Sequence, residues 1–426
     1  MAVIKQNISY GENKPERAFY GQEPLMAMYY KPDAETDPQL VYFYSEGTPG
    51  LRYDKNEGGK LMAYGFTGDP NSPKLMDFSK YGGEVDIPAL TYEFGAEPQN
   101  TIYKVTEVGQ YAFRGNSTIK TAKVKANVVV VGDNAFNSCS ALTQITFGDK
   151  IEEIRNGAVN NCANLGVITL GQGVKTIGGW AFAFNPKLTK ITIPASVSTV
   201  GRNTFEDCFA LKELDFEEGS KLTEIPFGMC YGNTDYMNLD SVKIPKSVTA
   251  IGEHAFYHCN VAKVVVDDIS SFCKIDFKNS YANPLNNVNG VKLFKGTTEI
   301  TKLSSADIAS EGDIIFPEIF YYTDIDTLEI NTAGTVKVER TSGSDISWDG
   351  GWVIKHLTIT QCDVGSYFEE GAFDSTFESV LISIQNSTWT AYEGNTAVDA
   401  ITTKTGVADC TNFFMEYYSR KIMRTS

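Results

Sequence analysis

Few side chains in this 426-residue sequence could support catalysis or bind a metal ion. Its three histidines include His254 and His258, which stand four positions apart beside Cys259. On a helix this spacing would place both imidazoles on one face, as a zinc site requires. The alternative is that they occupy variable positions on either side of Phe256. Because the sequence has neither an H-E-x-x-H motif nor a C-x-x-C pair, we favour that alternative and predict no metal site.

A pair of carboxylates among aromatic residues is a second candidate for chemistry. Asp345 and Asp349 lie near Trp348 and Trp352, and a glycoside hydrolase needs two carboxyl groups roughly 5 to 9.5 Å apart. The alternative is a polar turn. The sequence also lacks a G-x-S-x-G motif for a nucleophilic serine and an EF-hand calcium loop. We therefore predict no catalytic residues and no cofactor.

Composition and charge narrow the class of partner. Lys+Arg total 37 against Asp+Glu 53, a net charge of −16, whereas nucleic-acid binding needs a basic face. No stretch approaches the roughly 18 consecutive apolar residues of a membrane span. The opening residues, MAVIKQNISYGENKPE, lack the apolar region of a secretory signal. We expect that an export signal was removed and Met1 added as a start, the alternative being a protein that is not exported.

An internal repeat dominates the middle of the sequence. A motif such as VGQYAF or IGEHAF ends in an aligned apolar residue, and the first four intervals between these residues are each 23. The next two intervals are 25 and 26, with the extra residues in polar runs suited to loops. Seven units span roughly 100–266. The aligned residues are Phe113, Phe136, Val159, Phe182, Phe205, Cys230 and Phe256.

Each unit contains a short strand. Ile191 and Ile193 flank Thr192 with the period of two that is typical of a strand, and Pro194 ends it. A unit of this size cannot bury its apolar side alone, so it must stack on its neighbours, with strands paired in parallel at about 4.8 Å. The sequence therefore predicts a β-rich solenoid of stacked 23-residue coils, capped at both ends.

The position three residues beyond each aligned residue holds only Asn or Cys. We call this set the Asn/Cys ladder and predict that it is buried, with small side chains meeting backbone groups at a tight turn. Free cysteine behaves as a small hydrophobe, so we predict free thiols; the alternative is a disulfide between Cys139 and Cys162 on successive coils. The ladder comprises Asn116, Cys139, Cys162, Asn185, Cys208, Asn233 and Cys259.

Residues 188–208 (LTKITIPASVSTVGRNTFEDC) and 241–259 (SVKIPKSVTAIGEHAFYHC) resemble the BspA-type leucine-rich repeat of anaerobic bacterial surface proteins. Residues 82–113 are similar to the family's entry into its first repeat, 267–285 to a segment that interrupts the array, and 291–303 to the strand pair that reopens it. The resemblance implies a leucine-rich-repeat solenoid, placement at the cell surface or outside the cell, and adhesion-like roles.

The resemblance weakens past residue 300, where only EEGAF, ending at Phe373, is similar to a unit and Thr376 stands at the ladder position. Alternating apolar residues still predict degenerate coils, and 412–424 resembles a short amphipathic cap. We predict five regions: an aromatic-rich β cap (1–80), the seven-unit solenoid (81–266), the interruption (267–300), degenerate coils (301–388) and a C-terminal cap (389–426).

The middle residue of each short strand should point outward, because its neighbours point into the core. These residues form what we call the strand-face row, flanked by charged residues such as Lys190 and Glu213. The row is a candidate ligand-binding surface; the alternative is that threonine suits strands and charged residues suit water. The row comprises Lys123, Thr146, Thr169, Thr192, Asp215 and Lys243, with Val265 after it.

The leading hypothesis from the sequence is a non-catalytic recognition protein, because stacked coils make long binding surfaces. The expected partner is a host extracellular protein or glycan, with neither nucleic acid nor a membrane span involved. Two alternatives remain open: a glycan-acting enzyme that uses a carboxylate pair, and a structural surface-layer protein.

Overall fold

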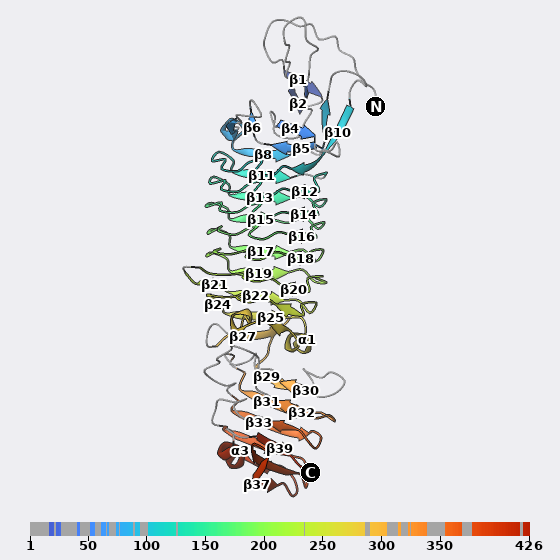
Figure 1. The fold of residues 1–426 in the computed structure, drawn as a ribbon, viewed down its shortest axis with the longest axis vertical. Helices are drawn as coiled ribbons and strands as arrows, with labels where there is room; N and C mark the ends of the chain where they lie inside the picture. Colours follow the sequence, from blue (N-terminus) through green and yellow to red (C-terminus); the bar gives the residue numbers. More distant parts are fainter. Residues whose placement is uncertain are drawn as a thin grey trace, which may run out of the picture.

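The chain folds as an elongated stack of coils that runs from the N-terminal to the C-terminal end (Figure 1). The predicted β-rich solenoid is confirmed. In this computed structural model the described residues are 17–20, 23–26, 41–42, 52–55, 61–64, 66–67, 74–75, 77–87, 90–93, 101–124, 127–233, 235–285, 290–304, 314–316, 323, 325–338, 354–368, 377–417 and 421–426.

The first strand of each coil contributes to one long side of the stack. Apolar residues alternate with outward residues, as in β17, where Ile191 and Ile193 are buried and Lys190 is exposed. Neighbouring strands pair in parallel without a shift, and the hydrogen-bonded ladder is divided between β15 and β17. The strands are β8(Glu84–Ile87), β11(Thr121–Val124), β13(Gln144–Phe147), β15(Val167–Thr169), β17(Lys190–Ile193), β19(Glu213–Phe216), β22(Ser241–Ile244), β25(Lys263–Val266) and β27(Lys292–Lys295), which ends in a hairpin with β28(Thr298–Glu299).

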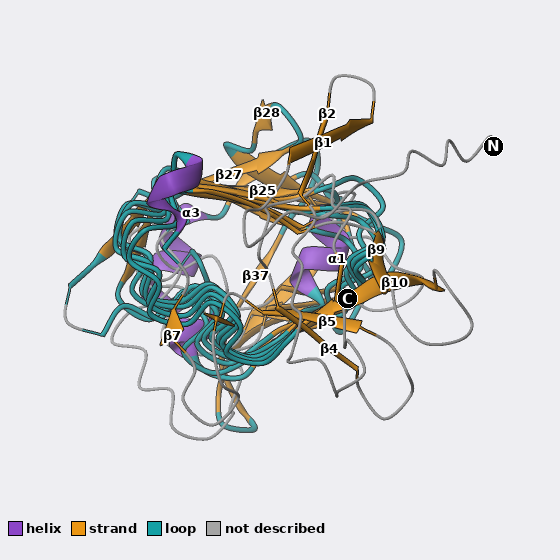
Figure 2. Cartoon of the chain, turned by 90° about the horizontal axis from the view of Figure 1, so that it is seen from above, coloured by secondary structure: helices purple, strands orange, loops and turns teal. Residues whose placement is uncertain are grey.

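A second side is formed by β10(Thr101–Val108) and a series of two-residue strands. The view along the stack shows the strands overlying one another on two sides, with loops between them (Figure 2). These strands are β10(Thr101–Val108), β12(Val130–Val131), β14(Glu153–Ile154), β16(Thr176–Ile177) and β18(Thr199–Val200), followed by β20(Glu224–Ile225), β23(Ala250–Ile251) and β26(Asp276–Phe277). A further parallel pair, β21(Met237–Leu239) and β24(Cys259–Val261), forms where the sixth unit is lengthened.

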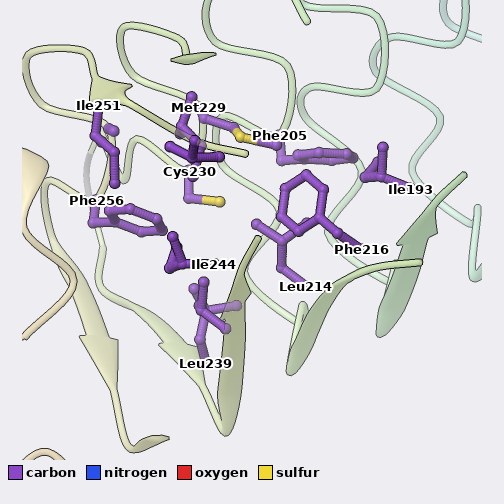
Figure 3. Packing of buried hydrophobic residues seen from close by; sticks show 14 of the residues in the cluster. Ile193, Phe205, Leu214, Phe216, Met229, Cys230, Leu239, Ile244, Ile251 and Phe256 are labelled. Atoms are coloured by element: carbon purple, nitrogen blue, oxygen red, sulfur yellow. The ribbon is translucent and has the colours of Figure 1, made fainter. Parts of the chain in front are cut away.

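Side chains from both sheets fill the interior. The aligned residue of each unit is fully buried, and the rings of Phe113 and Phe136 stack with their centroids 4.8 Å apart. Figure 3 shows Phe205 and Phe256 in the same interior as Phe216 of β19. Because a coil alone would leave one side of each ring in water, burial of these rings makes each coil depend on its neighbours.

Glycine allows the coils to approach closely after the second strand. A Cβ atom on Gly201 would lie 2.3 Å from the backbone nitrogen of Gly179 in the preceding coil. Only glycine fits that spacing without moving backbone, which explains the glycine of the VG and IG motifs.

The predicted interruption continues both sheets. Its helix α1(Ile269–Cys273) begins at Asp268, whose carboxylate accepts a hydrogen bond from the Ser271 N–H. The chain then forms β26, which pairs with β23, and the short 3-10 helix η2(Ser280–Ala282). Strand β27 returns to the first sheet beside β25.

Parallel two-sheet coils recur after residue 300. One sheet contains β29(Lys302–Ser304), β31(Thr327–Asn331), β33(His356–Gln361) and β35(Ser379–Ile382), and the other contains β30(Ile314–Phe316), β32(Val336–Val338) and β34(Tyr367–Phe368). Pairing becomes antiparallel with β36(Thr388–Glu393), β37(Thr396–Thr402), β38(Ala408–Asp409) and β39(Lys421–Arg424). The tail resembling an amphipathic cap contains α3(Thr411–Tyr417) and β39, and Phe414 packs against Trp389.

Most of residues 1–80 lie outside the described residues. The strands there are β1(Arg17–Tyr20), β2(Glu23–Met26), β3(Val41–Tyr42), β4(Arg52–Lys55), β5(Leu61–Tyr64), β6(Phe66–Thr67) and β7(Lys74–Leu75), with β9(Leu90–Glu93) after them. Strand β5 pairs with β10 and so extends the second sheet. The 3-10 helix η1(Phe78–Tyr81) places buried Phe78 6.0 Å from Phe113, covering the first ring of the interior.

Candidate binding surface

The strand-face row lies on the outer face of the first sheet. Lys123 pairs in register with Thr146, and Thr146 with Thr169. Beyond the division of the ladder, Thr192 pairs with Asp215, and Lys243 with Val265. Lys123 and Thr169 are exposed and the other row residues are half-buried. The register extends the row to Asp86 on β8 and to Phe294 on β27.

Charged residues on this face pair mainly across neighbouring strands. The Lys243 ammonium lies 3.3 Å from the Asp267 carboxylate, and Lys190 pairs with Glu213 one coil away. Lys212 donates to the backbone oxygen of Asn238 at 2.9 Å. Exposed pairs of this kind contribute about 0.2–1 kcal/mol each, so they order the face more than they stabilise the fold.

The Asn/Cys ladder joins successive coils through their turns. Its side chain donates to the backbone oxygen of the aligned residue in the preceding coil, as Cys139 does to Phe113 at 3.1 Å. Asn185 does more than a thiol can: its Nδ2 donates to the oxygens of Val159 and Phe182, and its Oδ1 accepts from the Cys162 N–H at 2.9 Å. The ladder is therefore part of the framework and faces away from solvent.

One ladder residue departs from the predicted burial. Asn233 is exposed, whereas Asn116, Cys139, Cys162, Asn185, Cys208 and Cys259 are buried. The sixth unit is lengthened by the loop before β21, which carries Asn233 outward, and its backbone N–H donates to Asp207 Oδ1 at 2.7 Å. The ladder resumes at Cys259, whose thiol donates to the oxygen of Cys230.

All eight cysteines are free thiols, so Cys139 and Cys162 form no disulfide. Burial raises the pKa of the Cys208 thiol to about 12 and also raises the pKa of Cys230 and Cys259. For Cys139 a hydrogen bond with Cys162, together with burial, raises the pKa well above its usual value. Because the thiolate is the reactive form, these thiols are unreactive at neutral pH.

In the turn after the second strand, the residue two positions before the aligned residue and the residue two positions after it adopt the left-handed conformation. Asn134 and Asn203 adopt it before Phe136 and Phe205, with φ of 54° and 57°. Asparagine tolerates this conformation, whereas other side chains lose roughly 1–2 kcal/mol in it. In the seventh unit both positions hold histidine, with φ of 56° at His254 and 53° at His258.

These two histidines belong to a cluster of rings that the sequence analysis missed. Tyr231 and Tyr257 occupy the same position of successive units, and their rings stack with centroids 5.0 Å apart. Tyr257 also stacks on His258 at 4.0 Å. The repeated tyrosine was the available signal in the sequence. We call this set the aromatic cluster: Phe227, Tyr231, Tyr236, His254, Tyr257, His258 and Tyr281.

The two histidines are not on a helix, so the arrangement that would have suited zinc does not form. Within the described residues no group of three His, Cys, Asp or Glu side chains could hold a metal ion. Asp345, Trp348, Asp349 and Trp352 lie outside the described residues, as do Phe373 and Thr376. None of the helices that the structure describes is long and apolar enough to cross a membrane.

Comparison with known proteins gives one family. A model of the BspA type leucine-rich repeat region matches in 6 copies over residues 106–234 and 234–340. No curated protein matches the chain.

Three solved structures to which the chain is similar are leucine-rich repeat proteins or a bacterial antigen. A leucine-rich repeat protein from Bacteroides ovatus is 20% identical, with 75% of this chain and 82% of that one covered and a TM-score of 0.36. A leucine-rich repeat protein from T. pallidum is 20% identical over 46% of this chain and 86% of that one, with a TM-score of 0.35. The pneumococcal vaccine antigen PcpA is 16% identical over 76% and 73%, with a TM-score of 0.34.

Proposed function

The chain belongs to the BspA-type leucine-rich-repeat family, and on that premise we propose that it is a non-catalytic recognition protein. It acts at the cell surface or outside the cell and binds a host protein or glycan through the strand-face row. Membership in this family supports the placement, and the shape of the first sheet supports the mode of binding.

The observation that carries the proposal is the register of the first sheet. Lys123, Thr146 and Thr169 stand side by side on paired strands, and so do Thr192 and Asp215. The backbones that carry these side chains are hydrogen-bonded in parallel, β11 to β13, β13 to β15 and β17 to β19, so little backbone order remains to be gained on binding. Such a preorganised surface loses less entropy when a partner docks.

The chemistry of the row fits a partner with mixed polar and charged groups. Threonine hydroxyls lie between a charged end at Lys123 and a second charged group at Asp215 and Lys243. Lys243 is already paired with Asp267, so a partner that approaches it meets a local dipole rather than an isolated charge. Complementary charges of this kind favour specificity and the rate of association.

Capture on immobilised host matrix proteins and mucin glycans tests the proposal. We expect at least one surface to retain the full chain, and Lys123→Glu with Lys243→Glu to reduce retention at least fivefold. The matched control is Lys150→Glu with Lys175→Glu, an equal change of charge at exposed lysines that lead into β14 and β16 of the second sheet. Equal retention of both variants, or retention by none of the surfaces, contradicts the proposal.

A further inference from the structure

The aromatic cluster stands on the turn side of the sixth and seventh coils, away from the strand-face row. Three of its rings are the most open ones, with 42% of Phe227, 56% of Tyr236 and 43% of Tyr281 exposed. A surface of aromatic rings held by a rigid fold is typical of a binding site, because such side chains bring a large contact area at little cost in entropy.

The cluster breaks the residue preference of its own turn. In the second and third units the left-handed positions hold the small residues Asn134, Ser138, Gly157 and Asn161. Larger residues occupy them at Tyr111, Trp180 and Phe184. A bulky residue can be retained there for packing: Trp180 donates to Glu206 at 2.8 Å and lies under the Arg202 guanidinium. The two histidines instead place their rings in the exposed aromatic cluster. Unfavourable backbone conformations that are retained on a protein surface are found most often at functional sites.

The rings fix one another's positions across three levels of the stack. Tyr257 lies between Tyr231 of the coil before and Tyr281 of the segment after, at 5.0 and 4.9 Å. His254 is held by Asn279, whose Oδ1 accepts from its backbone N–H at 3.2 Å. The side chains of the cluster therefore form one ordered surface and do not move separately.

The polar edges of these rings are available to a ligand. Within the described part of the chain, the hydroxyls of Tyr231, Tyr236, Tyr257 and Tyr281 make no hydrogen bond. Because such groups bind hydrogen-bonding partners whenever they can, the cluster presents apolar ring carbons next to free donors and acceptors.

Charge decides between classes of ligand. Asp235 and Glu253 adjoin the cluster and are exposed, whereas Lys278, the nearby lysine, pairs with Asp276. Carboxylates at this position repel an anionic ligand. A cation binds best when several ring faces enclose it, but here the faces of Tyr257 and His258 cover each other at 4.0 Å.

We propose that the aromatic cluster is a binding site for a neutral glycan, whose apolar sugar faces stack on Tyr236 and Tyr281 and whose hydroxyls bind the tyrosine and carboxylate oxygens. This rests on the proposed function in taking the chain as an extracellular recognition protein, but it adds a second site on the turn side. The acids at its border select neutral sugars over sulfated or sialylated ones.

Biolayer interferometry of the full chain tests this site, with separate surfaces of dextran, galactomannan, xyloglucan, yeast mannan and heparin. We expect at least one neutral polysaccharide to bind, and heparin to bind at least tenfold more weakly. Tyr236→Ala with Tyr281→Ala should weaken the neutral binding at least tenfold. The matched control is Tyr111→Ala, which removes a tyrosine that is 40% exposed in the first unit.

A second variant distinguishes a loss of binding from a loss of the fold. His254→Asn with His258→Asn keeps residues that tolerate positive φ, so we expect an unchanged melting temperature and at least threefold weaker binding. No binding to any neutral polysaccharide, stronger binding to heparin, or full binding by the double-tyrosine variant overturns the site. Loss of binding in Lys123→Glu with Lys243→Glu but not in the tyrosine variant would also overturn it, while leaving the proposed function intact.

Discussion

The coils from β11 to β25 and those from β29 to β35 share parallel two-sheet stacking but satisfy their turns differently. In the first set one side-chain position repeats the same bond, as Cys139 and Cys208 do to the oxygens of Phe113 and Phe182. In the second set Ser366, buried at one level, accepts from the Val336 N–H at 3.0 Å and donates to the Asp363 oxygen. Stacking therefore continues in coils that lack the ladder, and the ladder makes the turns uniform.

The largest expected effect removes a ladder residue whose side chain makes three buried hydrogen bonds. Asn185→Ala leaves the Cys162 N–H and the Val159 oxygen without partners in the core, so we expect the free energy of unfolding in urea to fall by about 3–4 kcal/mol. Asn185→Cys, the other residue that the ladder uses, should lose only about 1–2 kcal/mol.

Asn233 is the matched control, because it has the same residue type at the same repeat position but is exposed. Among the described residues its one hydrogen bond is made by its backbone, so Asn233→Ala should change stability by less than about 0.5 kcal/mol. Equal losses at Asn185 and Asn233 would contradict the role given to the ladder.

The next effect tests the close approach of the coils. Gly201→Ala places Cβ against the backbone of Gly178 and Gly179, so we expect a loss of about 2–3 kcal/mol in the same urea titration. Gly219→Ala is the control, since it meets nothing within 4 Å and only its φ of 76° opposes alanine, at about 1 kcal/mol. A loss at Gly201 no larger than that at Gly219 would argue against a steric cause.

A smaller effect is expected in the second set of coils. Ser366→Ala leaves the buried Val336 N–H without its acceptor and should reduce stability by about 1–2 kcal/mol. Thr360→Ala, which removes an exposed donor to the Ile330 oxygen, should cost less than about 0.5 kcal/mol. A loss at Ser366 as large as that at Asn185 would remove the distinction between the two sets.

The smallest effect at neutral pH concerns the buried thiols. Burial raises the folded-state pKa of Cys208 from 9.0 to about 12, so the native fold favours the neutral thiol. The contribution of the neutral Cys208 thiol to the free energy of unfolding is complete below about pH 9 and is lost as the pH rises towards 12. We expect the urea midpoint of the native chain to fall more steeply over this window than that of Cys208→Ser, which does not titrate; parallel curves would refute this.

The fold could be predicted from the sequence because the 23-residue period of its apolar residues arises from the stacking of equivalent coils. The alternation at Ile191 and Ile193 gave the strand and its buried face, and the recurrence of Asn and Cys gave the ladder. Asn233 was misplaced because equal spacing to an aligned residue does not reveal that a lengthened loop turns outward. Ser366 does not belong to a repeated position, so the hydrogen bond that it accepts from the Val336 N–H, 30 residues earlier, could not be predicted from the sequence.

The candidate site was harder to predict than the fold. The strand-face row follows from the strand period, and its register could be inferred from aligned units. The aromatic cluster combines side chains from four positions of the repeat with Tyr236 from a loop and Tyr281 from η2. Residues from unrelated segments meet there only because three levels of the stack are superposed.

The shift-free pairing of β11, β13 and β15 has a consequence for how such a chain can change length. Since every connection joins equivalent atoms one level apart, duplicating or deleting a whole 23-residue unit among these coils leaves both flanking joints chemically the same. Gain or loss of one unit therefore changes the distance between the N-terminal and C-terminal ends of the stack by a fixed step of about 4.8 Å. The length of the stack, and with it the number of positions in the strand-face row, can therefore change while the aromatic cluster stays as it is.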